Sequence, residues 1–512
     1  MQFHKYIAAG ALLVTAPFAQ QALALGPTAP VNVELFTSGS SAQQASLGQI
    51  VQSMCANDGS GNTTLDIYLD GTKGPSWRAY FCTLNPATSG GVSGNMLFHN
   101  RAKGGSIWGV VPVNRAWNVE YMNINNGNCT QVSAASGSTP GIYNCAASTH
   151  AGPIVSGECQ QTGAVNARTG FDLFCHKSDG GISDVDPAMF IPPNLPSGWT
   201  ALSSSEQSKF TFGTNRFSEY GVIFGLLATE DVYRDMQQTQ GLVTYTSSAD
   251  PTDWSEAKRP NLTTAQATSI FKGDFTNWKD VNQGFANAGG TFGAMAFCRR
   301  TAGSGTLAGA NARFLESPCR GGSLVPGSLS MVGASVSQPG YQVVENAGTG
   351  DLLTCLNNAY SATNFTAASG TVDFLGIQHG GIGFAGIEIN AGATPHPIHT
   401  GATPDHYDFV KIDGVSPTVA NAISGDYNYW FEQSIQWLKT ADGGPSGSQL
   451  TILTKFKDVA GNPATINSVP INGVAALSSN GWVWDNPANY PTMRGTRNGN
   501  SCQNVILNKD NP

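Results

Sequence analysis

The chain has 512 residues and a mass of 53.5 kDa, which is too long for one ordinary domain, so two or three domains are expected. Its formal net charge of −8 argues against nucleic acid or an anionic membrane as a partner, although local donors can still bind a small anion. Charged residues make up 12% and hydrophobic residues 40%, which indicates a loop-rich globular protein rather than a disordered one.

The first 24 residues have the pattern of a secretory signal. Lys5 precedes an apolar stretch from Ile7 to Ala16, and Ala22-Leu23-Ala24 provides a cleavage site of the small-x-small type. We expect cleavage after Ala24 and a periplasmic or secreted mature chain, without a lipid anchor because no cysteine follows the cleavage site. No later apolar run is long enough to span a bilayer.

The mature chain opens with a predicted strand, turn and helix. Alternating apolar residues predict a strand over 31–35, and a turn rich in Ser and Gly follows at 37–41. Apolar residues then recur at helical spacing, at Leu47, Ile50, Val51 and Met54. A second turn of small residues, Arg101–Ser106, comes just after Leu97-Phe98.

Residues 107–180 differ in character and are predicted to be a loop-rich insertion held together by disulfides. They carry Cys129, Cys145, Cys159 and Cys175, and the even total of ten cysteines fits an oxidising compartment and up to five disulfides. Spacing does not determine which cysteines pair. A first assignment pairs Cys129–Cys145, Cys159–Cys175, Cys55–Cys82 and Cys298–Cys319, which leaves Cys355–Cys502 by elimination.

The second half of the chain alternates predicted strands and helices. The apolar run Tyr220–Leu227 suits a buried parallel strand, and Thr263–Asp280 suits a short helix with a glycine turn. Gly350–Ala359 is predicted to be helical, Ile382–Ile387 to be a strand, and the region around Tyr429–Lys439 to be a helix. This alternation indicates α/β domains with largely parallel sheets, in which ligands bind at the carboxyl ends of strands.

The stretch Phe297–Phe314, FCRRTAGSGTLAGANARF, is the most informative motif. It places an arginine pair and a small polar turn between a predicted strand and a helix beginning near Thr306. The free N–H groups of a first helical turn and an arginine fork are suited to an oxyanion. An ordinary helix capped by serine gives the same pattern, so these residues alone leave both interpretations open.

Six segments, taken in order, resemble the phosphate-binding protein of the bacterial ABC phosphate importer. They are the Ser38–Ser41 turn, the Gly104-Gly105 turn, Ser183–Pro187, Phe271–Trp278, the Arg300–Thr306 motif (Arg-x-x-Gly-Ser-Gly-Thr) and the Gly381–Phe384 strand. The resemblance spans 31–106, 181–225 and 263–440. It implies a type 2 periplasmic-binding fold, α/β with two lobes and a hinge between them. Residues 25–219 and 400–512, including the insertion 107–180, would form lobe 1, and residues 220–399 lobe 2.

The resemblance also implies a ligand set. Arg300, Ser304, Gly305 and Thr306 would bind the anion from lobe 2, and Ser41 and the backbone of Ala42 from lobe 1. Asp184 falls where the family has an aspartate that accepts a proton from phosphate. Ala102 departs from the family, which has a serine before its Gly-Gly turn, and Arg101, Lys103 and Ser106 are the residues placed to compensate.

The function expected is binding of inorganic phosphate or a similar oxyanion, without a cofactor, metal or catalytic residue. The resemblance further implies an ABC permease as partner, and a monomer is expected. The alternatives are a phosphatase or other hydrolase on the same scaffold, or a surface protein that keeps the fold without the ligand. The chain has no G-x-S-x-G or H-E-x-x-H motif, and His396 and His399 lie in a proline-rich stretch that disfavours a metal site.

Overall fold

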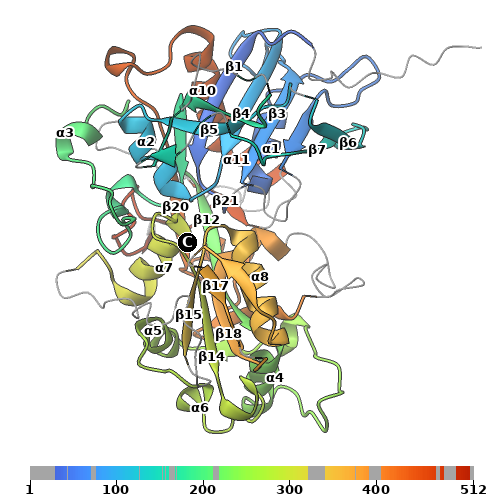
Figure 1. Ribbon diagram of the computed structural model, residues 1–512, viewed down its shortest axis with the longest axis vertical. Coiled ribbons are helices and arrows are strands. Elements are labelled where there is room, and N and C mark those ends of the chain that lie inside the picture. The colour runs from blue at the N-terminus through green and yellow to red at the C-terminus, as the bar shows by residue number, and fades with distance from the viewer. Residues whose placement is uncertain are drawn as a thin grey trace, which may run out of the picture.

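The computed structural model describes residues 29–507, with gaps at 71–75, 161–167, 212–217, 321–340, 391–404, 469–472 and 478–491 and at a few single positions. Those single positions are residues 43, 126, 151, 153, 156, 169, 369 and 375. The predicted signal segment and the pair His396 and His399 lie outside the described residues. Two lobes lie one above the other in Figure 1, joined by strands that run between them.

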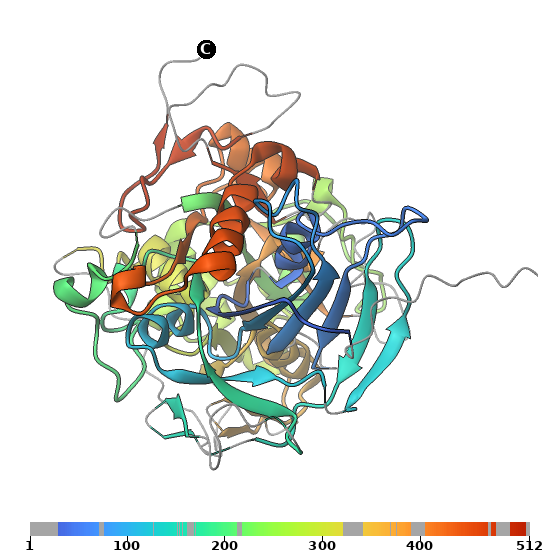
Figure 2. The ribbon, with the colours of Figure 1, turned by 90° about the horizontal axis from the view of Figure 1, so that it is seen from above.

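The first lobe is built on strand β1 (Val33–Gly39), which lies between two parallel neighbours, β4 (Asn95–Arg101) and β11 (Gly180–Ser183). Antiparallel β3 (Trp77–Thr83) and β2 (Asp66–Leu69) extend the sheet. Both faces of β1 are largely buried, as expected for a central parallel strand. Helix α10 (Gly447–Ala460) packs against β1 and helix α1 (Gln44–Gln52) packs against α10, and Figure 2 shows α10 lying across this lobe.

The second lobe is built on strand β14 (Met295–Arg300), which pairs in parallel with β15 (Gln342–Asn346) and β18 (Gly380–Gly386). Helix α5 (Thr264–Lys272) begins with a capping box from Thr263 and ends at the left-handed Gly273. Helices α7 (Gly305–Leu315) and α8 (Thr349–Ser361) complete the lobe around β14. The helices expected after Thr263, after Thr306 and over Gly350–Ala359 are therefore confirmed.

Strands β12 (Ser218–Thr229) and β20 (Trp430–Gln436) connect the lobes. The first half of β12 pairs with β20, and the second half pairs with β18, so the strand passes from one lobe into the other. Two predictions were wrong here. Every pairing of β12 is antiparallel, and Trp430–Gln436 is a strand rather than a helix. Burial of all seven residues of β20 explains the second error, because such a run lacks the alternation that marks a strand.

The insertion 107–180 contains more regular structure than the loops predicted there. Strand β7 (Gly141–Cys145) joins the main sheet beside β2, and β6 (Cys129–Ser133) forms its outer edge. Strands β5 (Asn118–Met122) and β10 (Leu173–Lys177) form a separate antiparallel pair. These short strands are rich in polar residues and lack a clear apolar alternation, which is why their pattern indicates loops.

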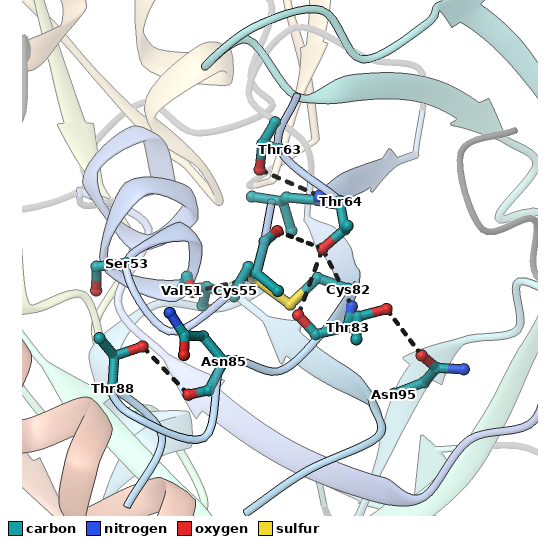
Figure 3. Close-up of a disulfide and its surroundings, with 12 residues drawn as sticks. Val51, Ser53, Cys55, Thr63, Thr64, Cys82, Thr83, Asn85, Thr88 and Asn95 are labelled. Carbon is teal, nitrogen blue, oxygen red and sulfur yellow. Dashed lines mark hydrogen bonds between the residues drawn. A yellow bond between two sulfur atoms is a disulfide. The ribbon is translucent and has the colours of Figure 1, made fainter. Parts of the chain in front are cut away.

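All ten cysteines are paired. The predicted bonds Cys55–Cys82, Cys129–Cys145 and Cys159–Cys175 are confirmed. The first of these links the segment after α1 to β3, and Figure 3 shows Thr64 beside it, with its hydroxyl donating to the carbonyl of Ala56 at 2.8 Å. Five disulfides indicate an oxidising compartment.

The remaining two disulfide predictions were wrong. Cys298 pairs with Cys355, and Cys319 pairs with Cys502. Helix α8 packs against β14 and holds the Cα atom of Cys355 6.0 Å from that of Cys298. Cys319 follows α7 and meets the C-terminal part of the chain. Both contacts join elements distant in sequence, which cysteine spacing does not report.

The predicted lobe boundary near residue 400 precedes strand β19. Strand β19 (Tyr407–Ile412) pairs with β12 and, in parallel, with β13 (Asn261–Leu262), so it extends the second lobe. The chain returns towards the first lobe only afterwards, through β20. The expected fold class, α/β with two lobes and a hinge, is confirmed, and parallel pairing holds at the centre of each lobe. Within the described residues, each helix is too short or too polar to cross a bilayer.

Candidate functional site

The N-terminus of α7 faces the first lobe. Ser304 is its N-cap, and the side-chain oxygen accepts a hydrogen bond from the backbone N–H of Leu307 at 3.3 Å. Ser304 and Thr306 are each 1% exposed. The turn before the cap requires glycine, because Gly303 has a φ of +94° and a Cβ there would lie 2.7 Å from the side chain of Ile107. Strand β14 and this turn thus deliver a helix N-terminus into the space between the lobes.

Asp184 lies opposite this helix, directly after β11. Its carboxylate accepts hydrogen bonds from the hydroxyls of Ser106 at 3.0 Å and Thr306 at 3.4 Å, and from the hydroxyl of Ser40. Ser106 also accepts from the backbone N–H of Asp184 at 3.2 Å. Asp184 is 1% exposed. Hydroxyls from both lobes therefore converge on one buried carboxylate.

Arg300, the last residue of β14, brings a fully buried guanidinium to the same region. Its Nη1 donates to the hydroxyls of Ser41 at 3.0 Å and Thr349 at 3.3 Å, and Nη2 donates to the carbonyl of Ala347 at 2.6 Å. Burial lowers the pKa of Arg300 to about 10, against the carboxylates of Asp184 and Asp351, which raise it. The guanidinium therefore keeps its positive charge at neutral pH.

Glu388 adds no negative charge to this site at neutral pH. It follows β18 in the short helical turn η5 (Ile387–Asn390). Burial, assisted by the charge of Asp184, raises the pKa of Glu388 to about 8, although Arg78 lowers it. The carboxyl is mostly protonated at pH 7, so the charge near Arg300 comes mainly from the guanidinium and the carboxylates of Asp184 and Asp351.

The two lobes contact each other at the site. The backbone N–H of Ile107 donates to the carbonyl of Gly303 at 2.9 Å, and the N–H of Gly303 donates to the carbonyl of Asn194 at 2.8 Å. The side chain of Asn311 on α7 reaches the side chain of Asn194 at 2.8 Å. A Cβ on Gly305 would lie 2.4 Å from the hydroxyl of Ser106, so glycine lets the lobes approach this closely.

The structure brings together most of the predicted ligands. Ser41, Ser106, Asp184, Arg300, Ser304, Gly305 and Thr306 share the interlobe region. Ala42 is buried at its edge, with its carbonyl close to Gly386. Lys103 lies apart from these residues, because its side chain is exposed and its ammonium sits 4.8 Å from the ring centre of Trp77.

Two contributors were missed in the sequence. Ser40 donates to Asp184, and Thr349 accepts from Arg300. Ser40 lies in the same Ser-rich turn as Ser41, so its position beside a helix N-terminus was the available signal. Thr349 begins α8, and nothing in its local sequence links it to Arg300. Ala102 is 2% exposed, and the hydroxyl that reaches Asp184 from this part of the chain is that of Ser106.

The fold and the site define a two-lobed α/β protein with a buried site, rich in hydroxyls, between its lobes. No family model matches the chain, and no curated protein matches it. Several solved structures resemble it. One is a putative phosphate ABC transporter substrate-binding protein with bound phosphate from Clostridium perfringens, at 14% identity and a TM-score of 0.31, covering 58% of this chain and 79% of that one.

The second is an ABC-type phosphate transport receptor from Vibrio cholerae, at 15% identity and a TM-score of 0.27, covering 55% of this chain and 74% of that one. The third is PstS from Borrelia burgdorferi, at 12% identity and a TM-score of 0.28, covering 58% of this chain and 79% of that one.

Proposed function

We propose that the protein binds an inorganic oxyanion, phosphate in particular, between its two lobes and does so without chemical turnover. The observation that carries the proposal is that a fully buried arginine and a buried carboxylate lie among hydroxyls from both lobes, at the N-terminus of α7. Arg300 supplies a charged fork, and the helix N-terminus supplies partial positive charge.

Hydroxyl groups suit this role because each can rotate about its C–O bond. Ser40, Ser106 and Thr306, which donate to Asp184, can each turn to donate to an oxygen of an anion. Asp184 can then accept a hydrogen bond from the proton that hydrogen phosphate carries near neutral pH. A buried carboxylate thus favours a protonated anion over one without a proton.

The proposal includes the setting in which the protein acts. Five disulfides and the signal pattern of the first 24 residues support a periplasmic or secreted protein. A permease that receives the anion is the partner that such a binding protein would serve.

Calorimetric titration of the mature, oxidised protein with phosphate, arsenate and sulfate at neutral pH tests the proposal. We expect saturable binding of phosphate and arsenate with one site per chain, and much weaker binding of sulfate. Absence of heat and of thermal stabilisation with all three anions would overturn it. Steady release of product from a generic phosphate ester by the purified protein would instead identify an enzyme.

A further inference from the structure

The C-terminal segment 492–507, which we term the strap, runs along the hinge strand β20. Glu432 of β20 accepts hydrogen bonds from the hydroxyl of Thr496 at 2.8 Å and from the backbone N–H of Arg497 at 2.7 Å. Arg497 is buried and donates from Nε to the carbonyl of Trp430 at 3.1 Å. Two residues of the strap thus anchor it firmly to the strand that joins the lobes.

The strap then contacts the first lobe at the turn that carries Asp184. The hydroxyl of Ser501 accepts a hydrogen bond from the backbone N–H of Asp186 at 2.9 Å, and both residues are buried. Asp186 follows Asp184 by two positions. In the same region, the sulfur of Cys502 lies 3.5 Å from that of Met189. Ser501 therefore fixes the backbone beside the buried carboxylate.

The next residue of the strap is bonded covalently to the second lobe. Cys502 forms a disulfide with Cys319, four positions beyond the end of α7. The opposite end of α7 carries Ser304 and Thr306 at the site. Adjacent residues of the strap thus hold the two elements that meet at the site, one from each lobe.

This disulfide is also the most accessible of the five. Cys502 is exposed and Cys319 is half-buried, and both line a surface pocket between α7, β20 and the strap. Each of the other four disulfides has at least one cysteine that is no more than 9% exposed. A small reductant in solution therefore reaches Cys319–Cys502 before the others.

We propose that the strap is a latch that keeps the two lobes closed on each other, and that breaking the Cys319–Cys502 bond allows them to separate. The hinge strands allow the lobes to move, whereas the disulfide ties the end of α7 to the strap, and the hydrogen bond from Asp186 to Ser501 holds the strap on the first lobe. Cutting the strap from α7 removes this link between the lobes, which stabilises the closed form, and so shifts the population towards the open form. The consequence for anion exchange rests on the proposed function, but the consequence for lobe separation does not.

The first test compares two double variants by small-angle scattering without added anion. In Cys319→Ser/Cys502→Ser the latch is removed, whereas the control Cys129→Ser/Cys145→Ser removes a disulfide in the insertion, far from the strap in the sequence. We expect a larger radius of gyration than wild type for the first variant and an unchanged one for the second. Equal radii for the latch variant and wild type, with both proteins folded by circular dichroism, would overturn the latch.

A second measurement uses the wild-type chain and so does not depend on the variant folding. A dithiol reductant gives two electrons and two protons to the disulfide, which yields two cysteine thiols and oxidises the reductant to its own disulfide. Brief treatment followed by thiol labelling should mark Cys319 and Cys502 first, together with the increase in radius of gyration. Opening of a different disulfide first, or labelling of this pair without any increase, would contradict the proposal.

The third measurement follows phosphate release by stopped flow. We expect the latch variant to release phosphate about tenfold faster than wild type, which corresponds to about 1.4 kcal/mol less stabilisation of the closed form. An unchanged release rate would count against the latch. If wild type binds no phosphate at all, the proposed function fails, and the scattering comparison still decides the latch.

Discussion

Arg300 of the second lobe donates a hydrogen bond of 3.0 Å to the hydroxyl of Ser41 in the first lobe. The same Nη1 atom reaches the hydroxyl of Thr349, while Nη2 and Nε donate to backbone carbonyls of 347 and 346. One guanidinium therefore connects the lobes and has its plane fixed by backbone groups. The positive charge of this guanidinium therefore lies beside Ser41, close to the N-terminus of α7.

Replacing Arg300 with lysine should weaken phosphate binding. Lysine keeps the charge but loses the planar fork, and one charge-assisted hydrogen bond contributes about 1.5–3 kcal/mol, so we expect a loss of about tenfold to a hundredfold in affinity by calorimetry. Arg299→Lys is the matched control, because Arg299 is the preceding residue of β14 and pairs with Glu345 at 3.0 Å. Equal losses in both variants would show that the effect belongs to the strand rather than the site.

Replacing Asp184 with asparagine should narrow the preference for phosphate over sulfate. The carboxylate can accept a proton from hydrogen phosphate but would face sulfate without one, and an unpaired charge of the same sign in a buried site is strongly repulsive. Calorimetric titration of wild type and Asp184→Asn with phosphate and with sulfate measures the ratio of the two dissociation constants for each protein. Asp186→Asn serves as the control, since asparagine can still accept the 2.7 Å hydrogen bond from the N–H of Ala188. Equal affinities of wild type for the two anions would remove Asp184 from the site.

Replacing Gly305 with alanine should impair binding without harming the fold. The new methyl group would lie 2.4 Å from the hydroxyl of Ser106 and 2.9 Å from Cβ of Asp184, so the lobes could not approach as they do now. Because the lobes must separate to admit the methyl group, the melting temperature should fall slightly, while circular dichroism should show the helices retained. Gly59→Ala is a neutral control, because nothing lies within 4 Å of a Cβ there. Unchanged affinity would argue against lobe contact in the bound form.

Replacing Asp66 with asparagine should stabilise the protein at neutral and higher pH. Asp66 begins β2, is fully buried, and both its carboxylate oxygens lack a hydrogen-bond partner among the described residues. Burial raises the pKa of Asp66 from an ordinary value of 3.8 to about 7. The folded state then holds a proton that the unfolded state releases between about pH 4 and pH 7, so wild-type stability falls as pH rises through this range.

Asparagine does not ionise, so Asp66→Asn avoids the loss of stability that ionising the buried carboxyl causes as pH rises. We expect Asp66→Asn to exceed wild type by about 1–3 kcal/mol in free energy of unfolding at pH 8, with the difference shrinking as the pH approaches 4. Denaturant titrations across this range measure it, and Asp442→Asn controls for removal of an exposed carboxylate. A constant difference at every pH would contradict the assignment of a buried, raised-pKa carboxyl.

The parts of the fold that sequence reasoning could predict are those with local signals. Glycine turns, caps and helical spacing mark α5, α7 and α8 within a few residues, because such signals act within one or two helical turns. The Ser-rich turn before α1 and the turn before α7 carry the same kind of signal. In the structure, these two turns carry or adjoin Ser40, Ser41 and Arg300 of the site.

What sequence reasoning missed depends on contacts between distant residues. Trp430–Gln436 is a strand because its backbone pairs with β11 and β12, and its spacing of apolar residues fits a helix equally well. Cys355 meets Cys298 only because α8 packs on β14. Thr349 approaches Arg300 through the same packing. In each case tertiary contacts decide between structures that the local sequence allows equally.

The distance along the chain between the strap and the elements that it joins also determines when they can be joined. Ser501 lies 315 residues after Asp186, and Cys502 lies 183 residues after Cys319. A chain that is still being synthesised or exported can form β1, α1 and their neighbours, but the strap cannot link α7 to the Asp184 turn until Ser501 and Cys502 have emerged. The link through the strap therefore forms later than the direct contacts between Ile107, Gly303 and Asn194, and chains truncated before residue 501 would keep those contacts but lack the link.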